Sequence, residues 1–321
     1  MQLFHSDVEA ANALANSYQK LKTEISKVII GQDETVRLLL TSIFSQGHCL
    51  LVGVPGLAKT LLVQTLASVL DLSFNRIQFT PDLMPSDITG SETLDKDRNF
   101  QFMQGAVFAN IILADEINRT PPKTQAALLE AMQEYAVTIA GKKYELPKPF
   151  FVLATQNPIE QEGTYPLPEA QLDRFMFNIW LGYPSFAAEV EVVKNTTSGQ
   201  KTTLEKILDA ETLRYFQQLI RKVIVADNVI EYAVKLVHKT RPQTELASKE
   251  ANAYLEWGAG PRASQYLIIG AKCNALLHGK YSPDIEDVKA VAKPILRHRI
   301  VRNFKAEAEG ISIDNIIEAM L

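Results

Sequence analysis

The sequence predicts an α/β domain with a five-stranded parallel sheet between helices, followed by a small all-helical domain. Short apolar runs alternate with helical patterns in the first half of the chain, which is typical of parallel strands joined by helices. These strand patterns stop at Gly182-Tyr183-Pro184, and only helical patterns follow. We therefore expect one domain over residues 1–183 and a second over residues 184–321.

The composition indicates a globular protein of ordinary polarity. Of its 321 residues, 46% are hydrophobic and 22% are charged. The net charge of −4 and pI near 5.8 argue against a broad nucleic-acid-binding face, although a local basic channel stays open. Cys49 and Cys273 do not have the spacing of metal ligands. We therefore expect both to be buried thiols in a reducing compartment. With no leader pattern and no apolar run near the roughly 18 residues of a membrane span, we expect a cytoplasmic protein.

A glycine-rich loop joins the apolar run 49–52 to a helical pattern. Its residues are Gly53, Val54, Pro55, Gly56, Leu57, Ala58, Lys59 and Thr60, and Leu61 continues into the helix. Strand, tight loop and helix form the context in which backbone N–H groups and a helix N-terminus bind phosphate. Lys59 would reach the β- and γ-phosphates, and the Thr60 hydroxyl would hold Mg²⁺. This segment predicts a nucleotide site.

Ala58 departs from the general pattern of such loops, which place Gly before the Lys. If this position required a positive φ, Ala would cost roughly 1–2 kcal/mol there. We therefore predict an ordinary negative φ at Ala58, already within the first helical turn.

Two helices are predicted ahead of the first strand, over residues 8–28 and 35–44, from the helical spacing of their apolar residues. The loop between them contains Ile30 and Gly31. It lies just ahead of the strand in sequence, where backbone groups could hold an adenine base. A plain turn between helices explains the spacing equally well.

Two hairpins are predicted outside the sheet. After a strand over 72–79 and a short helix between the prolines at 81 and 85, residues 91–103 form the first, with a charged tip. Residues 137–146 form the second, with a Gly-Lys-Lys tip. Each is interpreted either as a partner-contacting element or as a solvated loop.

The apolar strand 111–114 ends in Asp115 and Glu116. An acidic pair at a strand end is more often a solvated turn, but a phosphate-binding loop in the same chain favours the Walker B interpretation. Asp115 would hold Mg²⁺ through water, and Glu116 would orient and deprotonate the attacking water. The prolines at 121 and 122 then mark a helix start.

Two further candidates follow strand patterns. Asn157 comes after the buried strand 150–155, and in a parallel sheet such a position faces the ligand crevice. Asn157 could position the lytic water, or it could cap the turn before Pro158. Arg174 precedes the last strand, 175–181. It could pair with Asp173 or another acid, or reach the γ-phosphate of a neighbouring subunit.

The second domain consists of predicted helices. Their ranges are 186–194, 204–220, 229–240, 262–277 and 285–298. Arg262 begins one of them directly after Pro261, which is a favourable first-turn residue.

In combination these motifs closely resemble the MoxR family of AAA+ ATPases, over essentially the whole chain. The segments that carry the resemblance are Gly-Val-Pro-Gly-Leu-Ala-Lys-Thr (53–60), Ala-Asp-Glu-Ile-Asn-Arg (114–119), Pro-Pro-Lys-Thr-Gln (121–125), Leu-Leu-Glu-Ala-Met-Gln-Glu (128–134), Ala-Thr-Gln-Asn-Pro (154–158) and Glu-Gly-Thr-Tyr-Pro-Leu-Pro-Glu-Ala-Gln-Leu-Asp-Arg-Phe (162–175). The family commonly carries Ala at the position of Ala58.

The resemblance implies a P-loop AAA+ core with a helical lid, and ATP and Mg²⁺ as cofactors. It also implies a role for each matching residue: Lys59 and Thr60 in Walker A, Asp115 and Glu116 in Walker B, Asn157 as sensor 1, Arg174 as an arginine finger acting in trans, Arg262 as the sensor-2 arginine of the lid, and Arg119 as a second intersubunit candidate. The two hairpins resemble the helix-2 insert and pre-sensor-1 insert of magnesium chelatase motor subunits.

The function implied is that of a MoxR-type ATPase. Such proteins form homo-oligomeric rings, often hexamers, and hydrolyse MgATP at protomer interfaces to remodel or mature protein complexes. Their partners commonly carry a von Willebrand factor A domain. Three alternatives stay open: a metal-insertion motor of the chelatase type, a nucleic-acid motor, which the acidic pI disfavours, and a non-hydrolysing scaffold, which Glu116 argues against.

Overall fold

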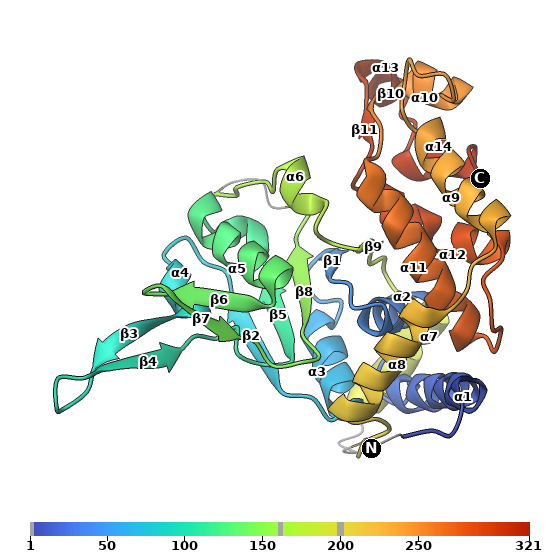
Figure 1. The fold of residues 1–321 in the computed structure, drawn as a ribbon. Coiled ribbons are helices and arrows are strands. Elements are labelled where there is room, and N and C mark those ends of the chain that lie inside the picture. The colour runs from blue at the N-terminus through green and yellow to red at the C-terminus, as the bar shows by residue number, and fades with distance from the viewer. Residues whose placement is uncertain (1–2, 160–162, 198–201) are drawn as a thin grey trace.

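The computed structural model describes residues 3–159, 163–197 and 202–321. Glu162, the first residue of the last segment named above, lies outside the described residues. The chain has an α/β part and a C-terminal helical part (Figure 1). The α/β part is built on a five-stranded sheet of order β2-β5-β8-β1-β9, in which all neighbouring strands are parallel. The predicted sheet is therefore confirmed. Its strands are β1 (Cys49–Val52), β2 (Phe74–Gln78), β5 (Ile111–Asp115), β8 (Phe151–Gln156) and β9 (Phe177–Trp180).

The alternation of side chains along the strands divides the interior into two apolar cores. Leu51, Leu113 and Leu153 point into one core, whereas their neighbours Leu50 and Ile112 point into the other. Helices cover both faces, which is why the central strands are continuous apolar runs. The helices of the α/β part are α1 (Asp7–Ser26), α2 (Asp33–Phe44), α3 (Lys59–Val69), α4 (Pro85–Thr89), η1 (Ile117–Arg119), α5 (Pro122–Glu134) and α6 (Glu169–Leu172).

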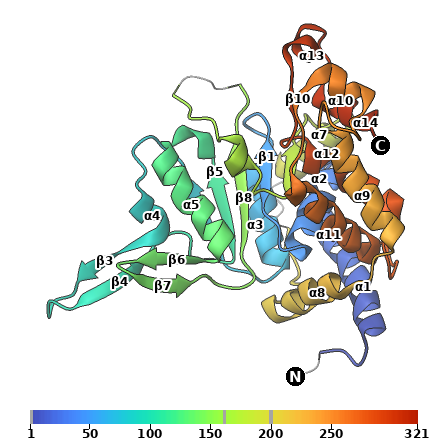
Figure 2. The same ribbon diagram turned by 45° about the horizontal axis from the view of Figure 1, so that its top comes forward.

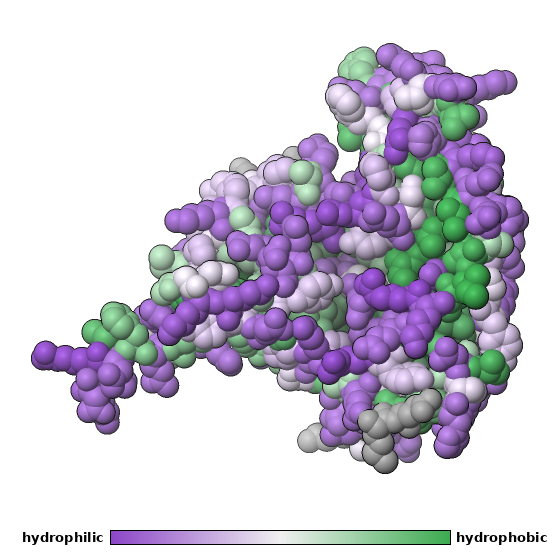
Figure 3. Space-filling view, in the orientation of Figure 1, coloured by the Kyte–Doolittle hydropathy of each residue, from purple (hydrophilic) through white to green (hydrophobic). Residues whose placement is uncertain are grey.

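Two hairpins project from the α/β part. They consist of β3 (Gly90–Leu94) with β4 (Phe100–Gln104), and β6 (Ala136–Ile139) with β7 (Lys142–Glu145). Both views show them side by side at the end farthest from the C-terminal helices (Figures 1 and 2). Phe102 stacks on Tyr144 with ring centroids 4.0 Å apart, which ties one hairpin to the other. Near the polar tip of β3–β4, Figure 3 shows a hydrophobic patch, where Leu94 and Phe100 are exposed.

The C-terminal part is helical, as predicted, and its helices are α7 (Phe186–Thr197), α8 (Ala210–Lys222), α9 (Asp227–Lys239), α10 (Lys249–Tyr254), α11 (Pro261–Leu277), α12 (Ile285–Leu296), α13 (Phe304–Ala308) and α14 (Ile313–Glu318). The short helices α10, α13 and α14 were not predicted, and two further details differ from the prediction. The helix expected from 204 starts at Ala210, because the Asp209 side chain caps it by accepting from the Thr212 amide. A short antiparallel pair, β10 (Leu255–Trp257) and β11 (Val301–Arg302), lies among the helices, and strands this short have no readable alternation.

The N-terminal helices pack against the C-terminal ones. Helix α1 contacts α8 and α11 as well as α3, and α2 contacts α8 and α11. Arg37 of α2 donates to Asn274 Oδ1 at 2.9 Å and to the Ala290 carbonyl at 3.1 Å. The two parts thus share one apolar core, and the division at 183/184 stays a prediction. No described helix is both long and apolar enough to cross a membrane.

Candidate active site

Three segments that are far apart in sequence surround one cavity of about 410 Å³. They meet because β1, β8 and β5 are adjacent parallel strands, whose carboxyl ends share one edge of the sheet. The residues that line the cavity are Pro55, Gly56, Leu57, Ala58, Lys59, Thr60, Leu61, Asp115, Glu116 and Asn157. The structure therefore brings together most of the site residues that the sequence predicts.

The loop before α3 is held in place by hydrogen bonds to its backbone, one from a side chain. The Gly53 amide donates to the Gln156 carbonyl at 3.2 Å, and Gln32 Nε2 donates to the Leu57 carbonyl at 3.3 Å. Helix α3 begins at Lys59 without a side-chain cap, so its first N–H groups face the loop region where phosphate would bind. Lys59 Nζ donates to the Gly53 carbonyl. Burial lowers the pKa of Lys59, and the Asp115 and Glu116 carboxylates oppose that shift.

The prediction of a negative φ at Ala58 is wrong. Ala58 has φ 55° and ψ 29°, which is the left-handed region, and it is the N-cap of α3 rather than part of its first turn. The chain turns here from the loop into the helix, following Gly56 at φ 87°. The strain of roughly 1–2 kcal/mol is tolerated because Ala is small and unbranched, and such strain is concentrated at functional sites.

Thr155, at the end of β8, joins Asp115 to Glu116. Its Oγ1 donates to Asp115 Oδ1 at 2.7 Å and accepts from the Glu116 amide at 2.8 Å. Thr155 is fully buried, so it gives Asp115 a fixed orientation. Glu116 Oε2 in turn accepts from Gln78 Nε2 at 2.9 Å and pairs with Arg119 Nε at 3.1 Å.

The sequence analysis did not identify three residues that contact Asp115 or Glu116. They are Thr155, Gln78 and Arg76. Arg76 and Gln78 are alternate residues of β2, and Gln78 lies opposite Asp115 in the ladder between β2 and β5. Arg76 Nη2 lies 2.7 Å from Asp115 Oδ2. Polar residues at alternate strand positions are a signal, but the order of the strands is needed before they can be assigned to Asp115.

The oxygen donors in the cavity fit Mg²⁺. Thr60 contributes a hydroxyl and Asp115 a carboxylate, and both line the same cavity. Mg²⁺ prefers oxygen ligands and keeps several waters and substrate phosphates, so one or two protein groups suffice. In the described residues no group of three or more His, Cys, Asp or Glu side chains could hold a metal by itself.

Asn157 is buried and lines the cavity, at the end of the strand beside β5. Its Oδ1 accepts from the Ile159 amide at 3.2 Å, which is the contact of a turn cap. The two interpretations of Asn157 are therefore compatible, because the turn holds the side chain at the cavity wall.

Arg174 and Arg262 lie outside this cavity and line another of about 150 Å³. Arg174 does not pair with Asp173, because Asp173 pairs with Arg299 Nε at 2.7 Å and with Arg262 Nη1 at 3.2 Å. Within the described chain, no carboxylate lies at ion-pair distance from Arg174. The roles of Arg174 in trans and of Arg262 as a sensor stay predictions.

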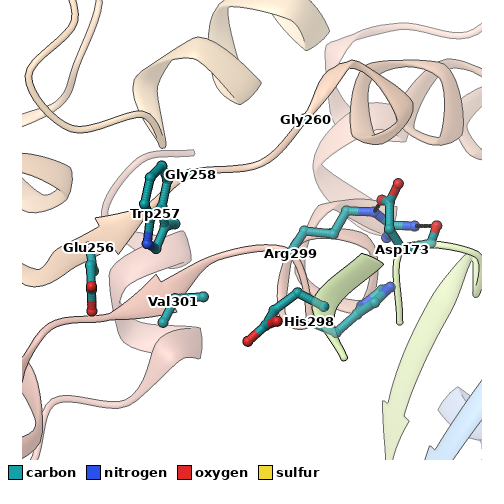
Figure 4. Close-up of a pocket in the computed structure, with 9 residues that line it drawn as sticks. Asp173, Glu256, Trp257, Gly258, Gly260, His298, Arg299 and Val301 are labelled. Atoms are coloured by element: carbon teal, nitrogen blue, oxygen red, sulfur yellow. Dashed lines mark hydrogen bonds and ion pairs between the residues drawn. The ribbon is translucent and has the colours of Figure 1, made fainter. Parts of the chain in front are cut away.

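Arg299 connects residues 173–175 to the C-terminal helices. The sequence analysis did not identify Arg299. Figure 4 shows Arg299 against Asp173 beside a further cavity of about 510 Å³, across which Trp257 and Glu256 lie on β10. Arg299 is buried and also donates to the Phe175 carbonyl at 2.6 Å. Removing it would leave Asp173 with Arg262 as its remaining ion-pair partner, so Arg299 is a principal link between the two parts.

Ile30 and Gly31 also lie outside the cavity lining. Gly31 has φ +72°, and a Cβ at this position would lie 2.6 Å from Ala188 Cβ of α7. The loop is thus packed tightly against the first C-terminal helix. Its predicted contact with adenine stays a prediction.

A parallel sheet whose carboxyl edge presents a phosphate-binding loop, a lysine and two acidic residues defines a P-loop nucleoside triphosphatase. Comparison with known proteins narrows this class. Residues 48–177 match the family described as "ATPase family associated with various cellular activities (AAA)", and residues 247–320 match the AAA lid domain.

Three similar proteins span nearly the same length. Chaperone MoxR1 of Mycobacterium tuberculosis is 42% identical over 316 residues, covering 98% of this chain and 83% of the relative. Protein MoxR of Methylorubrum extorquens is 30% identical, covering 88% and 86%. The crystal structure of a presumed ATPase from Cytophaga hutchinsonii superposes with a TM-score of 0.90 at 45% identity, covering 97% and 95%. The chain belongs to the MoxR family of AAA+ ATPases.

Proposed function

We propose that the protein hydrolyses MgATP at interfaces between its own copies and uses the energy to remodel or mature protein complexes. The observation that carries this proposal is the convergence of Lys59, Thr60, Asp115 and Glu116 on one cavity. A bound triphosphate there would meet a helix N-terminus, a cation and the two acids that the reaction requires.

Each residue of the cavity has a task in this reaction. Lys59 neutralises charge on the β- and γ-phosphates, and Thr60 and Asp115 would hold Mg²⁺, which would supply further charge neutralisation. Glu116 accepts the proton of the water whose oxygen bonds to the γ-phosphorus, while the bond to the ADP oxygen breaks. Asn157 orients that water.

The site gains its last cation from a neighbouring copy. Among the described residues that line the cavity, Lys59 is the single cationic side chain. Arg174 lies away from the cavity of its own chain and has no carboxylate partner there, so it is available to the cavity of the next protomer. Arg262 would link the lid to the presence of γ-phosphate. Together these roles support a ring-shaped homo-oligomer, with a hexamer as the expected form.

A protein is the proposed client. One relative is named a chaperone, and the exposed Leu94, Phe100 and Met103 on the β3–β4 hairpin offer an apolar contact surface. A partner with a von Willebrand factor A domain remains part of the proposal. The cytoplasmic location expected from the sequence stays a prediction.

Client capture tests the remodelling role. The Glu116→Gln variant, loaded with MgATP and immobilised, is expected to retain proteins that ADP-loaded protein releases, since ATP would hold the client-bound state. The captured material is identified by mass spectrometry, with the Lys59→Ala, Glu116→Gln double variant as the control. Retention of the same proteins with ADP, or of nucleic acid instead of protein, would contradict the proposal.

A further inference from the structure

Arg76 of the edge strand β2 forms an ion pair with Asp115, the carboxylate proposed to hold Mg²⁺. Arg76 Nη2 and Nε both donate to Asp115 Oδ2, at 2.7 and 3.1 Å. The other oxygen, Oδ1, accepts from Thr155 Oγ1 at 2.7 Å. Both oxygens of Asp115 therefore have a donor, and one of these donors carries a full positive charge.

The surroundings make this contact consequential. The Asp115 side chain is 15% exposed, so solvent screens its charge poorly. The Arg76 side chain is 47% exposed and also donates to Gln78 Oε1, so it borders solvent on its outer side. Arg119 forms a similar ion pair with Glu116, with Nε 3.1 Å from Oε2. A divalent cation that approaches alone would meet two carboxylates that already have cationic partners.

We propose that Arg76 competes with Mg²⁺ for Asp115 and thereby makes metal binding conditional on the nucleotide. The phosphates supply the negative charge that allows Mg²⁺ to enter beside Asp115 while Arg76 withdraws. The ligand selected is then the Mg²⁺–nucleotide complex, and free Mg²⁺ is rejected. This inference rests on the proposed function, because it assumes that the cavity binds a nucleoside polyphosphate.

The size of the effect follows from Coulomb's law. A guanidinium and a divalent cation that share one carboxylate would lie several ångströms apart in a partly exposed site. At such separations their repulsion is large enough to change metal affinity about tenfold. Removing the charge of Arg76 is expected to remove that penalty.

The test measures equilibrium binding of a fluorescent ADP analogue, once with saturating Mg²⁺ and once with EDTA. The ratio of the two affinities reports how strongly Mg²⁺ binding and ADP binding depend on each other, and it needs no turnover. In Arg76→Gln this ratio is expected to be about tenfold smaller than in the wild type, because Mg²⁺ then also binds the nucleotide-free protein. Arg76→Lys, which keeps the charge, is expected to stay near the wild-type ratio. Lys235→Gln, on the outer surface of α9, controls for the loss of one positive charge.

An unchanged ratio in Arg76→Gln would overturn the inference, as would a Lys variant that behaves like the Gln variant. A second measurement needs no variant: Mn²⁺ electron paramagnetic resonance should detect tight metal binding to the wild type only when ADP is present. Tight binding of Mn²⁺ alone would equally overturn it. A wild type that binds no ADP under either condition would instead refute the proposed function.

Discussion

Replacing Glu116 by Gln is expected to lower the ATP turnover rate at least a hundredfold while ATP stays bound, because general-base catalysis contributes about 10²–10⁴-fold. The amide has nearly the shape of the carboxylate and can still contact Gln78 and Arg119, but it cannot accept the proton of water. Phosphate release measures turnover, and a fluorescent ATP analogue measures binding.

Glu130 offers a matched control for this variant. It is an exposed acid on α5, so Glu130→Gln removes the same charge away from the cavity and should hydrolyse ATP at the wild-type rate. Wild-type turnover in Glu116→Gln would remove Glu116 from its role. Loss of ATP binding in that variant would show that the carboxylate acts in binding rather than in catalysis.

Arg174→Ala is the second change with a very large expected effect. Arginine fingers raise the rate of phosphoryl transfer about 10³–10⁵-fold, so the pure variant should lose almost all turnover. Its own cavity is unchanged, because Arg174 lines a different one, and ATP binding should persist. Mixing the variant with wild-type subunits should also depress hydrolysis, since each site borrows an arginine.

A complementation experiment separates a trans role from a cis role. Subunits with Arg174→Ala retain Glu116, and subunits with Glu116→Gln retain Arg174. In randomly mixed rings about a quarter of the interfaces would join an intact Glu116 to an intact Arg174, so activity should reappear when two inactive proteins are mixed. A mixture as inactive as its parents, with subunit exchange verified by mass spectrometry, would contradict the trans assignment.

The sheet and most of the cavity lining were predictable from the sequence. Buried strands are apolar runs, and the polar residues directly after them, such as Asp115 and Asn157, must lie at one edge of a parallel sheet. This reasoning needs only chain order and strand direction. It therefore located the cavity without knowledge of any long-range contact.

The features that were not predicted depend on which elements become neighbours. Arg76 reaches Asp115 because β2 pairs with β5, and Arg299 reaches Asp173 across more than a hundred residues of sequence. Ala58 shows a different limit. Its left-handed backbone is imposed by the turn into α3, and this geometry overrides the local preference of Ala.

The central claim is that Lys59 and the acids at the end of β5 enclose a triphosphate, and equilibrium binding of MgATP tests it most directly. Isothermal titration calorimetry of the wild type with Mg²⁺ and a non-hydrolysable ATP analogue should give saturable binding in the micromolar range, and Lys59→Ala should weaken it at least tenfold, because a charged contact to phosphate is worth about 1.5–3 kcal/mol. Lys235→Gln should bind as the wild type does. Wild-type protein that binds no MgATP at millimolar concentration, or a Lys59→Ala variant with unchanged affinity, would contradict the account.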